Sequence, residues 1–214
     1  MRPRDAATLI IVRDRREVLV GVRSAGHVFM PHMYVFPGGR VDPGDARVPC
    51  PVDMDKTTED KLCRSLTRPR ARALAMTAVR ETFEETGLVL GCKPRLPVRS
   101  RSPHWKPFFD LGLVPDLAKL EYVGRAITPP NQVRRYDARF FMVDAKHMQG
   151  ELRGNGELED LRWAGLRSAH RLALSPITEL MLNMLKRRIT GKPEDPHQVP
   201  FFRELNGKEL IEYE

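Results

Sequence analysis

Two short apolar runs near the start of the chain, residues 8–12 and 17–22, lie on either side of the charged residues 13–16. Runs of this length around a polar turn are typical of a strand hairpin. Further runs predict strands that begin at Val89 and span residues 120–127, 134–143 and 161–166. Residues 23–33 are predicted to form a loop, in which His27 and His32 are expected to be surface or packing residues.

In residues 69–86 the apolar positions have the spacing that is typical of a helix. Met76, Val79 and Phe83 recur at i, i+3 and i+7, which places them on one face of a helix. Pro69 suits the start of such a helix, and Gly87 suits its C-terminal stop. The pattern predicts a long helix with one core-facing side.

A second helical stripe follows the pair Ser175-Pro176, which suits a cap and a first helical residue. This stripe ends before Gly191. Its apolar residues are Ile177, Leu180, Met181, Met184 and Ile189. The stripe predicts a second core-facing helix.

Residues 93–116 carry five prolines and little periodicity, which predicts a long loop with a short helix at 105–111. Its aromatic residues are Trp105, Phe108 and Phe109. They either stack on a nucleobase or pin the loop to the body, and pinning is favoured.

The long helix also carries an acidic edge. Glu81, Glu84 and Glu85 fall within an arc of roughly 100° at about 100° per residue. Adjacent carboxylates repel one another unless a cation lies among them, and hard oxygen ligands suit Mg²⁺ or Mn²⁺. A solvated glutamate-rich face is the alternative interpretation.

The acidic stretch RETFEETGL (residues 80–88) follows an upstream segment FPGGRVDPGD (residues 36–45). Together they resemble the Nudix box, G-x5-E-x7-R-E-U-x-E-E-x-G-U, where U is a bulky aliphatic residue. The matching positions are Gly39, Arg80, Glu81, Glu84, Glu85, Gly87 and Leu88. Three departures stand out: Thr82 replaces an aliphatic residue, Asp45 replaces the first glutamate, and 34 residues replace the usual seven.

The resemblance implies an α+β Nudix fold, with a mixed β-sheet core sandwiched between α-helices. It implies that Glu81, Glu84, Glu85 and the backbone carbonyl of Gly38 hold Mg²⁺ or Mn²⁺ for diphosphate hydrolysis. Arg80 would then orient the box carboxylates. Gly38 and Gly39 allow positive φ and close backbone approach, although an ordinary tight turn is the alternative.

Other candidate site residues rest on the same resemblance. Arg134 and Arg135 are candidates for holding a pyrophosphate, together with Arg23, although strand alternation would turn only one of the neighbouring pair toward the site. Glu157 and Glu159, in a predicted acidic loop at 151–160, are candidates for an accessory base or ligand. Surface arginines and an exposed acidic loop are the alternatives.

The segment from Phe29 to Gly39 and the long insertion look like the Nudix branch of peroxisomal coenzyme A diphosphatases and their bacterial relatives. The other coenzyme A signature of bacterial Nudix enzymes, with arginine and histidine before the glycines, is not present. Coenzyme A or its acyl esters therefore lead the expected substrates, followed by ADP-ribose, dinucleoside polyphosphates or NADH, with RNA last. A Nudix domain that senses a nucleotide or binds RNA without hydrolysis is the competing class.

With 214 residues and 41% hydrophobic content, the chain can bury one core. We expect a Nudix domain at 1–191, with an insertion at 46–70, and a linker with a β-hairpin tail at 192–214. Glu59 to Leu66 is expected to form a helical turn or two, and Asn206-Gly207 is a hairpin signal. The tail would cover the domain or join a partner subunit in a homodimer.

No apolar run approaches a membrane span, and the start of the chain predicts a strand and no signal peptide. Three cysteines without C-x-x-C spacing suggest neither zinc nor a disulfide framework, so a cytoplasmic location is expected. The net charge of +8 is compatible with nucleic acid, an anionic membrane surface or a polyanionic small substrate, and a solvated surface is the default interpretation of the basic stretches 61–72 and 93–106. Basic residues are not interleaved with aromatic ones, so nucleic acid is not an expected partner.

Overall fold

The computed structural model describes residues 2–26, 30–191, 198–205 and 207–214. Its helices are α1 (Lys56–Cys63), α2 (Arg68–Thr86), α3 (Lys106–Asp110) and α4 (Pro176–Thr190), with the short 3-10 turns η1 (Asp45–Arg47), η2 (Leu117–Lys119), η3 (Ala145–His147) and η4 (Ala169–Arg171). The strands are β1 (Arg4–Arg13), β2 (Glu17–Arg23), β3 (Tyr34–Val35), β4 (Gly38–Arg40), β5 (Gly91–Cys92), β6 (Val114–Pro115), β7 (Glu121–Ile127), β8 (Tyr136–Asp144), β9 (Leu158–Gly165), β10 (Pro200–Leu205) and β11 (Lys208–Tyr213). Predictions that involve His27, Phe29, residues 192–197 or Asn206 lie outside the described residues.

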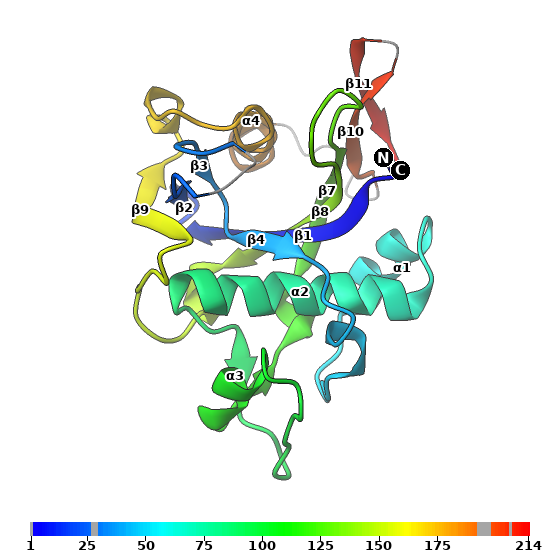
Figure 1. Cartoon of the computed structure of the whole chain (residues 1–214), viewed down its shortest axis with the longest axis vertical. Coiled ribbons are helices and arrows are strands. Elements are labelled where there is room, and N and C mark those ends of the chain that lie inside the picture. Colours follow the sequence, from blue (N-terminus) through cyan, green and yellow to red (C-terminus); the bar gives the residue numbers. More distant parts are fainter. Residues whose placement is uncertain (1, 27–29, 192–197, 206) are drawn as a thin grey trace.

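A mixed sheet forms the centre of the molecule, in the order β11-β10-β7-β8-β1-β2-β3 (Figure 1). The predicted hairpin is confirmed, since β1 and β2 pair antiparallel with Val12 opposite Val18. Strand β8 runs parallel to β1, whereas β7 runs antiparallel to β8. Strand β4 also pairs with β1, at Ala6 to Thr8. Because β2 pairs with the other end of β1, the sheet forks at the glycines of β4.

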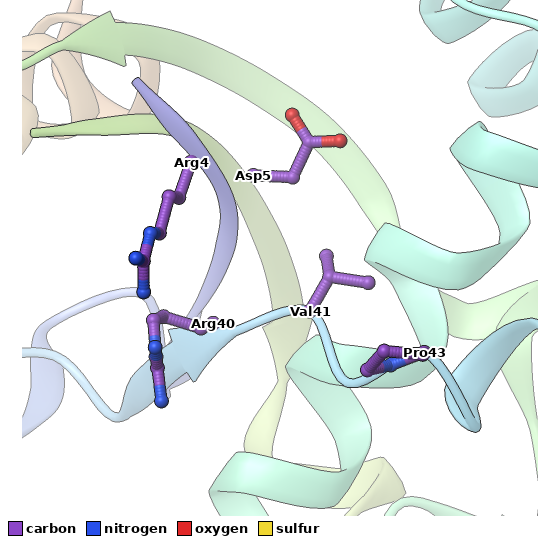
Figure 2. Close-up of a pocket in the computed structure, with 5 residues that line it drawn as sticks. All are labelled: Arg4, Asp5, Arg40, Val41 and Pro43. Atoms are coloured by element: carbon purple, nitrogen blue, oxygen red, sulfur yellow. The ribbon is translucent and has the colours of Figure 1, made fainter. Parts of the chain in front are cut away.

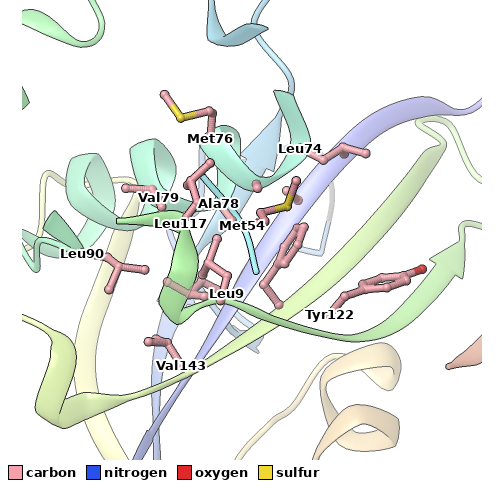
Figure 3. Packing of buried hydrophobic residues seen from close by; sticks show 14 of the residues in the cluster. Leu9, Met54, Leu74, Met76, Ala78, Val79, Leu90, Leu117, Tyr122 and Val143 are labelled. Atoms are coloured by element: carbon pink, nitrogen blue, oxygen red, sulfur yellow. The ribbon is translucent and has the colours of Figure 1, made fainter. Parts of the chain in front are cut away.

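Helices α2 and α4 cover opposite faces of this sheet (Figure 1). Between α2 and the sheet, aliphatic residues from β1, β8 and the insertion form the larger core, part of which is seen in Figure 3. Between α4 and the other face, a second core contains Ile10, Phe140 and Met181. The α+β fold with a mixed sheet between helices is therefore confirmed.

The box helix follows the sequence prediction closely. Helix α2 has Pro69 in its first turn, and Gly87 ends it in the left-handed conformation with φ 72°. Met76 and Val79 are fully buried, and Phe83 is nearly so. The second helix, α4, is capped by the Ser175 hydroxyl, which accepts a hydrogen bond from the Thr178 amide at 3.3 Å.

Several element boundaries differ from the predictions. Helix α1 begins at Lys56, earlier than expected, because the Asp55 side chain caps it by accepting hydrogen bonds from the amides of residues 57 and 58. The strand expected from Val89 is reduced to β5, preceded by a single bridge between Val89 and Gln149. Strand β8 begins at Tyr136 instead of residue 134, and β9 begins at Leu158 instead of residue 161.

The long loop carries α3, as predicted, and its aromatic residues pin it to the body. Trp105 and Phe108 are buried, and the Phe108 ring meets the Phe83 ring of α2 edge-on at 5.4 Å between centroids. The pinning interpretation is therefore correct for these two residues. Phe109 lies partly buried against the same core.

The C-terminal tail forms the hairpin β10–β11, which adds to the sheet through a parallel pairing of β10 with β7. Phe202 of β10 packs in the core under α4. The tail therefore covers its own domain. Among the described residues, no helix is both long and apolar enough to span a bilayer.

Candidate functional site

The site forms where the sheet forks, and its shape depends on two glycines. A Cβ on Gly39 would lie 2.4 Å from Cδ of Glu81, so a side chain there would displace this carboxylate. A Cβ on Gly38 would lie 2.4 Å from the backbone oxygen of Ala7. The Gly38 amide donates a 2.7 Å hydrogen bond to Oε2 of Glu85. The double glycine therefore lets the α2 carboxylates lie against the β4 backbone.

Arg80 connects the acidic residues of α2 to one another. Its Nη1 donates to Oε1 of Glu81 at 2.8 Å and to Oε2 of Glu84 at 3.1 Å. Its Nη2 donates to the backbone oxygen of Arg40 in β4 at 3.0 Å. Burial alone would lower the pKa of the guanidinium, but Asp45 and the two glutamates hold its pKa above the ordinary value. Arg80 therefore stays charged and fixes the rotamers of its neighbours.

Asp45 holds the other side of Arg80. It is completely buried, and its two oxygens accept from Arg80 Nε at 2.9 Å and Nη2 at 3.0 Å. The Thr77 hydroxyl, the Asp42 amide and the Trp105 indole complete its partners, at 2.7, 3.0 and 2.8 Å. A buried carboxylate with this many donors is well compensated.

The carboxylates near the glycines carry unfavourable charge in the absence of a cation. Burial raises the pKa of Glu81 to about 7, against the opposing effect of Arg80. Burial, reinforced by the charge of Glu81, raises the pKa of Glu85 well above its ordinary range. Glu84, which is less buried, has its pKa raised by desolvation as well. Perturbed carboxylates in a cleft are a mark of a functional site.

These groups line one end of a large cavity of about 1040 Å³. From the fork, the cavity extends over the α4 face of the sheet to the C-terminal hairpin. Its lining includes Thr128 and Gln132 of the β7–β8 loop, Ile177 of α4 and Phe202 of β10. The volume is sufficient for a nucleotide-sized ligand.

A second hollow of about 390 Å³ lies next to the fork, lined by Arg4, Asp5, Arg40, Val41 and Pro43 (Figure 2). The Arg4 side chain extends toward that of Arg40 there, while Asp5 points away from them. Asp5 is paired with Arg70 of α2 at 2.5 Å. Arg40 therefore borders both hollows and gives this rim of the site a positive charge.

No family model matches the chain. A Nudix hydrolase from Alicyclobacillus acidocaldarius has a similar structure, with a TM-score of 0.64 and 27% sequence identity over 92% of this chain and 99% of that one. The chain has the Nudix hydrolase fold. The E. coli ORF135 protein shows the same fold at a TM-score of 0.52, with 17% identity over 91% of this chain and 96% of that one.

A Caenorhabditis elegans protein that carries the name nudix hydrolase 7 is 28% identical over 153 residues. The match covers 65% of this chain and 44% of that protein, so the chain spans less than half of the relative's length. Together these likenesses show the Nudix fold and a distant sequence similarity to a Nudix hydrolase.

The Nudix fold brings together some of the predicted substrate residues and not others. Arg134 lines the cavity, whereas Arg135 donates to the backbone oxygen of Thr128 and lies outside the lining. Both precede β8, so the loop path and not strand alternation separates them. Arg23 also lines the cavity, and its buried Nε has no hydrogen-bond partner among the described residues.

The two candidate accessory glutamates also differ in whether they line the cavity. Glu157 lies just before β9 and lines the cavity, where its charge helps to raise the pKa of Glu81 and Glu85. Glu159 is an exposed residue within β9 and lies outside the cavity lining. The predicted acidic loop therefore contributes one glutamate to the site.

The Nudix box residues fit a divalent cation by their donor chemistry. Glu85 is buried beside Glu81, and both pKa values are raised, so an added positive charge there would favour both ionised forms. Across the part of the chain that the structure describes, no three His, Cys, Asp or Glu side chains converge on one metal position. In this arrangement Nη1 of Arg80 bridges Glu81 and Glu84.

Two neighbours of the box were not predicted as part of the site. Nδ1 of the exposed His104 lies 3.9 Å from Oε1 of Glu84, and the Trp105 indole bonds Asp45. The proline-rich loop that carries them has no motif that indicates a contact with the box. The hairpin residues that line the cavity had no such signal either.

Proposed function

We propose that this chain hydrolyses a diphosphate linkage in a nucleoside-diphosphate-X compound, with Mg²⁺ or Mn²⁺ as cofactor. One observation carries the proposal: the carboxylates of Glu81 and Glu85 lie against the Gly38–Gly39 backbone at the end of a nucleotide-sized cavity. The likeness to Nudix hydrolases supports the same reaction class.

The residues of the box would have two roles, metal binding and positioning of the metal ligands. Glu81, Glu84 and Glu85, with the Gly38 carbonyl, would hold the metal, while Arg80 keeps the carboxylates in place. When bound, the metal polarises phosphoryl oxygens and lowers the pKa of a coordinated water.

The cavity also supplies groups for the substrate and for proton transfer. Arg23 and Arg134 would bind the diphosphate, since guanidinium groups match phosphate oxygens. A glutamate takes the proton of the attacking water, and Glu157 is the candidate that faces the cavity from outside the box.

For the X group we propose coenzyme A or its acyl esters first, and ADP-ribose, NADH or dinucleoside polyphosphates next. This order rests on the sequence resemblance around residues 29–39 and on the long insertion between Asp45 and Arg80. The RNA-directed alternative would require affinity that falls steeply with salt, whereas a small substrate gives a weaker slope.

The test is a hydrolysis assay with these compounds, each in Mg²⁺ and in Mn²⁺. The wild-type chain is compared with Glu84→Gln and with Glu151→Gln, an exposed glutamate outside the cavity lining. We expect turnover in the wild type and in Glu151→Gln, and a loss of at least 100-fold in Glu84→Gln.

Two results would contradict the proposal. Equal turnover in both variants would remove Glu84 from the reaction. Binding of a nucleotide without turnover in either metal would instead identify a nucleotide sensor.

A further inference from the structure

A continuous row of side chains crosses six strands beneath the cavity. In the register of the sheet, each member of the row lies directly opposite the next. From β11 to β4, the row is Ile211, Phe202, Ala126, Ala138, Ala6 and Arg40. All six residues line the cavity, so the row is its floor.

The three alanines at the centre of the row explain why this face of the sheet is hollow. Directly opposite positions on neighbouring strands share a face, and a methyl group fills little of the space above it. Helix α4 lies over the same face, where Ile177 and Leu180 form a wall of the cavity. The result is a groove that runs across the strands from the hairpin to the fork.

The two ends of this groove differ in chemistry. At the fork lie Arg40, Glu81 and Glu85. At the hairpin end the floor consists of Phe202 and Ile211. The five steps between β11 and β4 correspond to roughly 24 Å at about 4.8 Å per strand. An elongated ligand with its diphosphate at the fork would reach the hairpin.

At the hairpin end the floor residues Phe202 and Ile211 are apolar, and the charged residues Arg203, Glu204 and Glu209 line the same end of the cavity. Phe202 is buried, whereas Ile211, opposite it on β11, is 55% exposed. Leu205, on the same hairpin, is 49% exposed but does not line the cavity. The chain thus contains a matched pair of exposed aliphatic residues, one inside the groove and one outside it.

We infer that Phe202 and Ile211 form a specificity-determining end of the groove, which binds an apolar group that the substrate carries roughly 20 Å from its diphosphate. The inference rests on the proposed function for the position of the diphosphate. It assigns the substrate to a chemical class: nucleoside-diphosphate compounds whose X group ends in an extended apolar chain. Compounds that end in a sugar would leave this end of the groove empty.

The test compares three probes that differ at the far end: decanoyl-coenzyme A, coenzyme A and ADP-ribose. They are measured with the wild type, Ile211→Glu and the matched control Leu205→Glu. The kcat and KM values are determined where a probe is hydrolysed, and Kd by calorimetry where it is not. For decanoyl-coenzyme A, we expect Ile211→Glu to raise KM or Kd about tenfold without changing kcat. Neither ADP-ribose in this variant nor any probe in Leu205→Glu should change by more than twofold.

Three results would overturn the inference. The wild type could bind decanoyl-coenzyme A no more tightly than coenzyme A, Ile211→Glu could raise KM or Kd equally for all three probes, or Leu205→Glu could raise them as much as Ile211→Glu does. Absence of hydrolysis with every probe in both metals would instead overturn the proposed function. In that case, the Kd values would still decide whether the hairpin end binds the apolar chain.

Discussion

At the scale of single residues, Asp45 shows how the site tolerates a shortened acid in the box. An aspartate is one methylene shorter than the glutamate of the Nudix pattern, yet both of its oxygens are fully used. Trp105 contributes the indole donor from a loop 60 residues away in sequence. Because Arg80 is held from the other side by Asp45, the position of the box carboxylates depends indirectly on this loop.

We therefore expect Trp105→Phe to act through Asp45. The substitution keeps an aromatic ring in the cluster with Phe108 but removes the indole donor, so kcat should fall roughly 3- to 10-fold, as expected for about 1 kcal/mol. KM should stay within twofold, because the indole lies away from the cavity lining. Steady-state kinetics measures both, with Phe109→Leu in the same aromatic cluster as the control.

A double-mutant cycle separates this role from general stabilisation. If Trp105 acts through Asp45, adding Trp105→Phe to Asp45→Asn should cost little further kcat. Multiplicative losses in the double variant would show that the two residues act independently.

The raised pKa of Glu81 gives a second prediction at this scale. In the unfolded chain this carboxyl has its ordinary pKa, and in the folded chain its pKa is about 7, so the folded state binds more protons between these values. The stability of the metal-free protein should therefore fall as pH rises from about 4.5 to 7. Glu85, whose pKa is raised as well, acts in the same direction.

Thermal unfolding in EDTA at pH 5 and pH 8 measures this effect. Glu81→Gln should raise Tm at pH 8 by a few degrees, since about 1 kcal/mol shifts Tm by roughly 2–4 °C in a domain of this size. Added Mg²⁺ should restore Tm in the wild type more than in the variant, and more at pH 8 than at pH 5. A Tm of the metal-free wild type that rises across this range would contradict the pKa shift.

At the scale of elements, the sequence predicted those parts whose signals are local. Helix α2 has an apolar stripe, an initial proline and a terminal glycine, all within its own segment. The β1–β2 hairpin likewise depends on its own turn. In contrast, the early start of β9 depends on its pairing with β2, which is irregular between Val20 and Val22. A pairing of this kind carries no signal in the β9 sequence.

The same distinction applies to the site. The spacing of Glu81, Glu84 and Glu85 places them on one helix edge, so their proximity was predictable. Whether Glu157 or Glu159 faces the cavity depends on where β9 begins, which the sequence alone did not determine. The groove floor depends on the register of six strands, and the contacts that set it are non-local.

Gly39 links β4 to α2 and provides a prediction for this element pair. In Gly39→Ala the new Cβ would meet the Glu81 carboxylate at 2.4 Å, so the carboxylate or the strand must move. We expect a loss of tenfold or more in kcat, because catalytic groups tolerate little displacement. Gly26→Ala is the control, since a Cβ there has no neighbour within 4 Å. Unchanged hydrolysis in Gly39→Ala, measured under saturating substrate and metal, would remove this constraint from the site.

At the scale of the whole molecule, the C-terminal hairpin is tied to the body at two places. Phe202 enters the core beneath α4, and Glu214 accepts hydrogen bonds from Tyr122 at 2.6 Å and from Arg125 at 2.9 Å. These contacts involve both faces of the sheet, since Tyr122 belongs to the core beneath α2. The hairpin should therefore unfold together with the domain and not before it.

Phe202→Ala tests this cooperativity. Removal of a buried phenylalanine costs about 3–5 kcal/mol in well-packed cores, so the urea midpoint should fall strongly while a single transition remains. Leu205→Ala, at an exposed position on the same hairpin, should leave the midpoint nearly unchanged. Far-UV circular dichroism reports on the sheet, and tryptophan fluorescence reports on the buried Trp105 and the partly buried Trp163, so coincident curves would indicate one cooperative unit. A hairpin that detaches first, or that exchanges between subunits, would instead give a concentration-dependent early transition, with the tryptophan signal unaffected. The groove keeps its apolar end only if the hairpin and the domain are stable as one body, so this measurement also determines whether the hairpin can act as part of a substrate site.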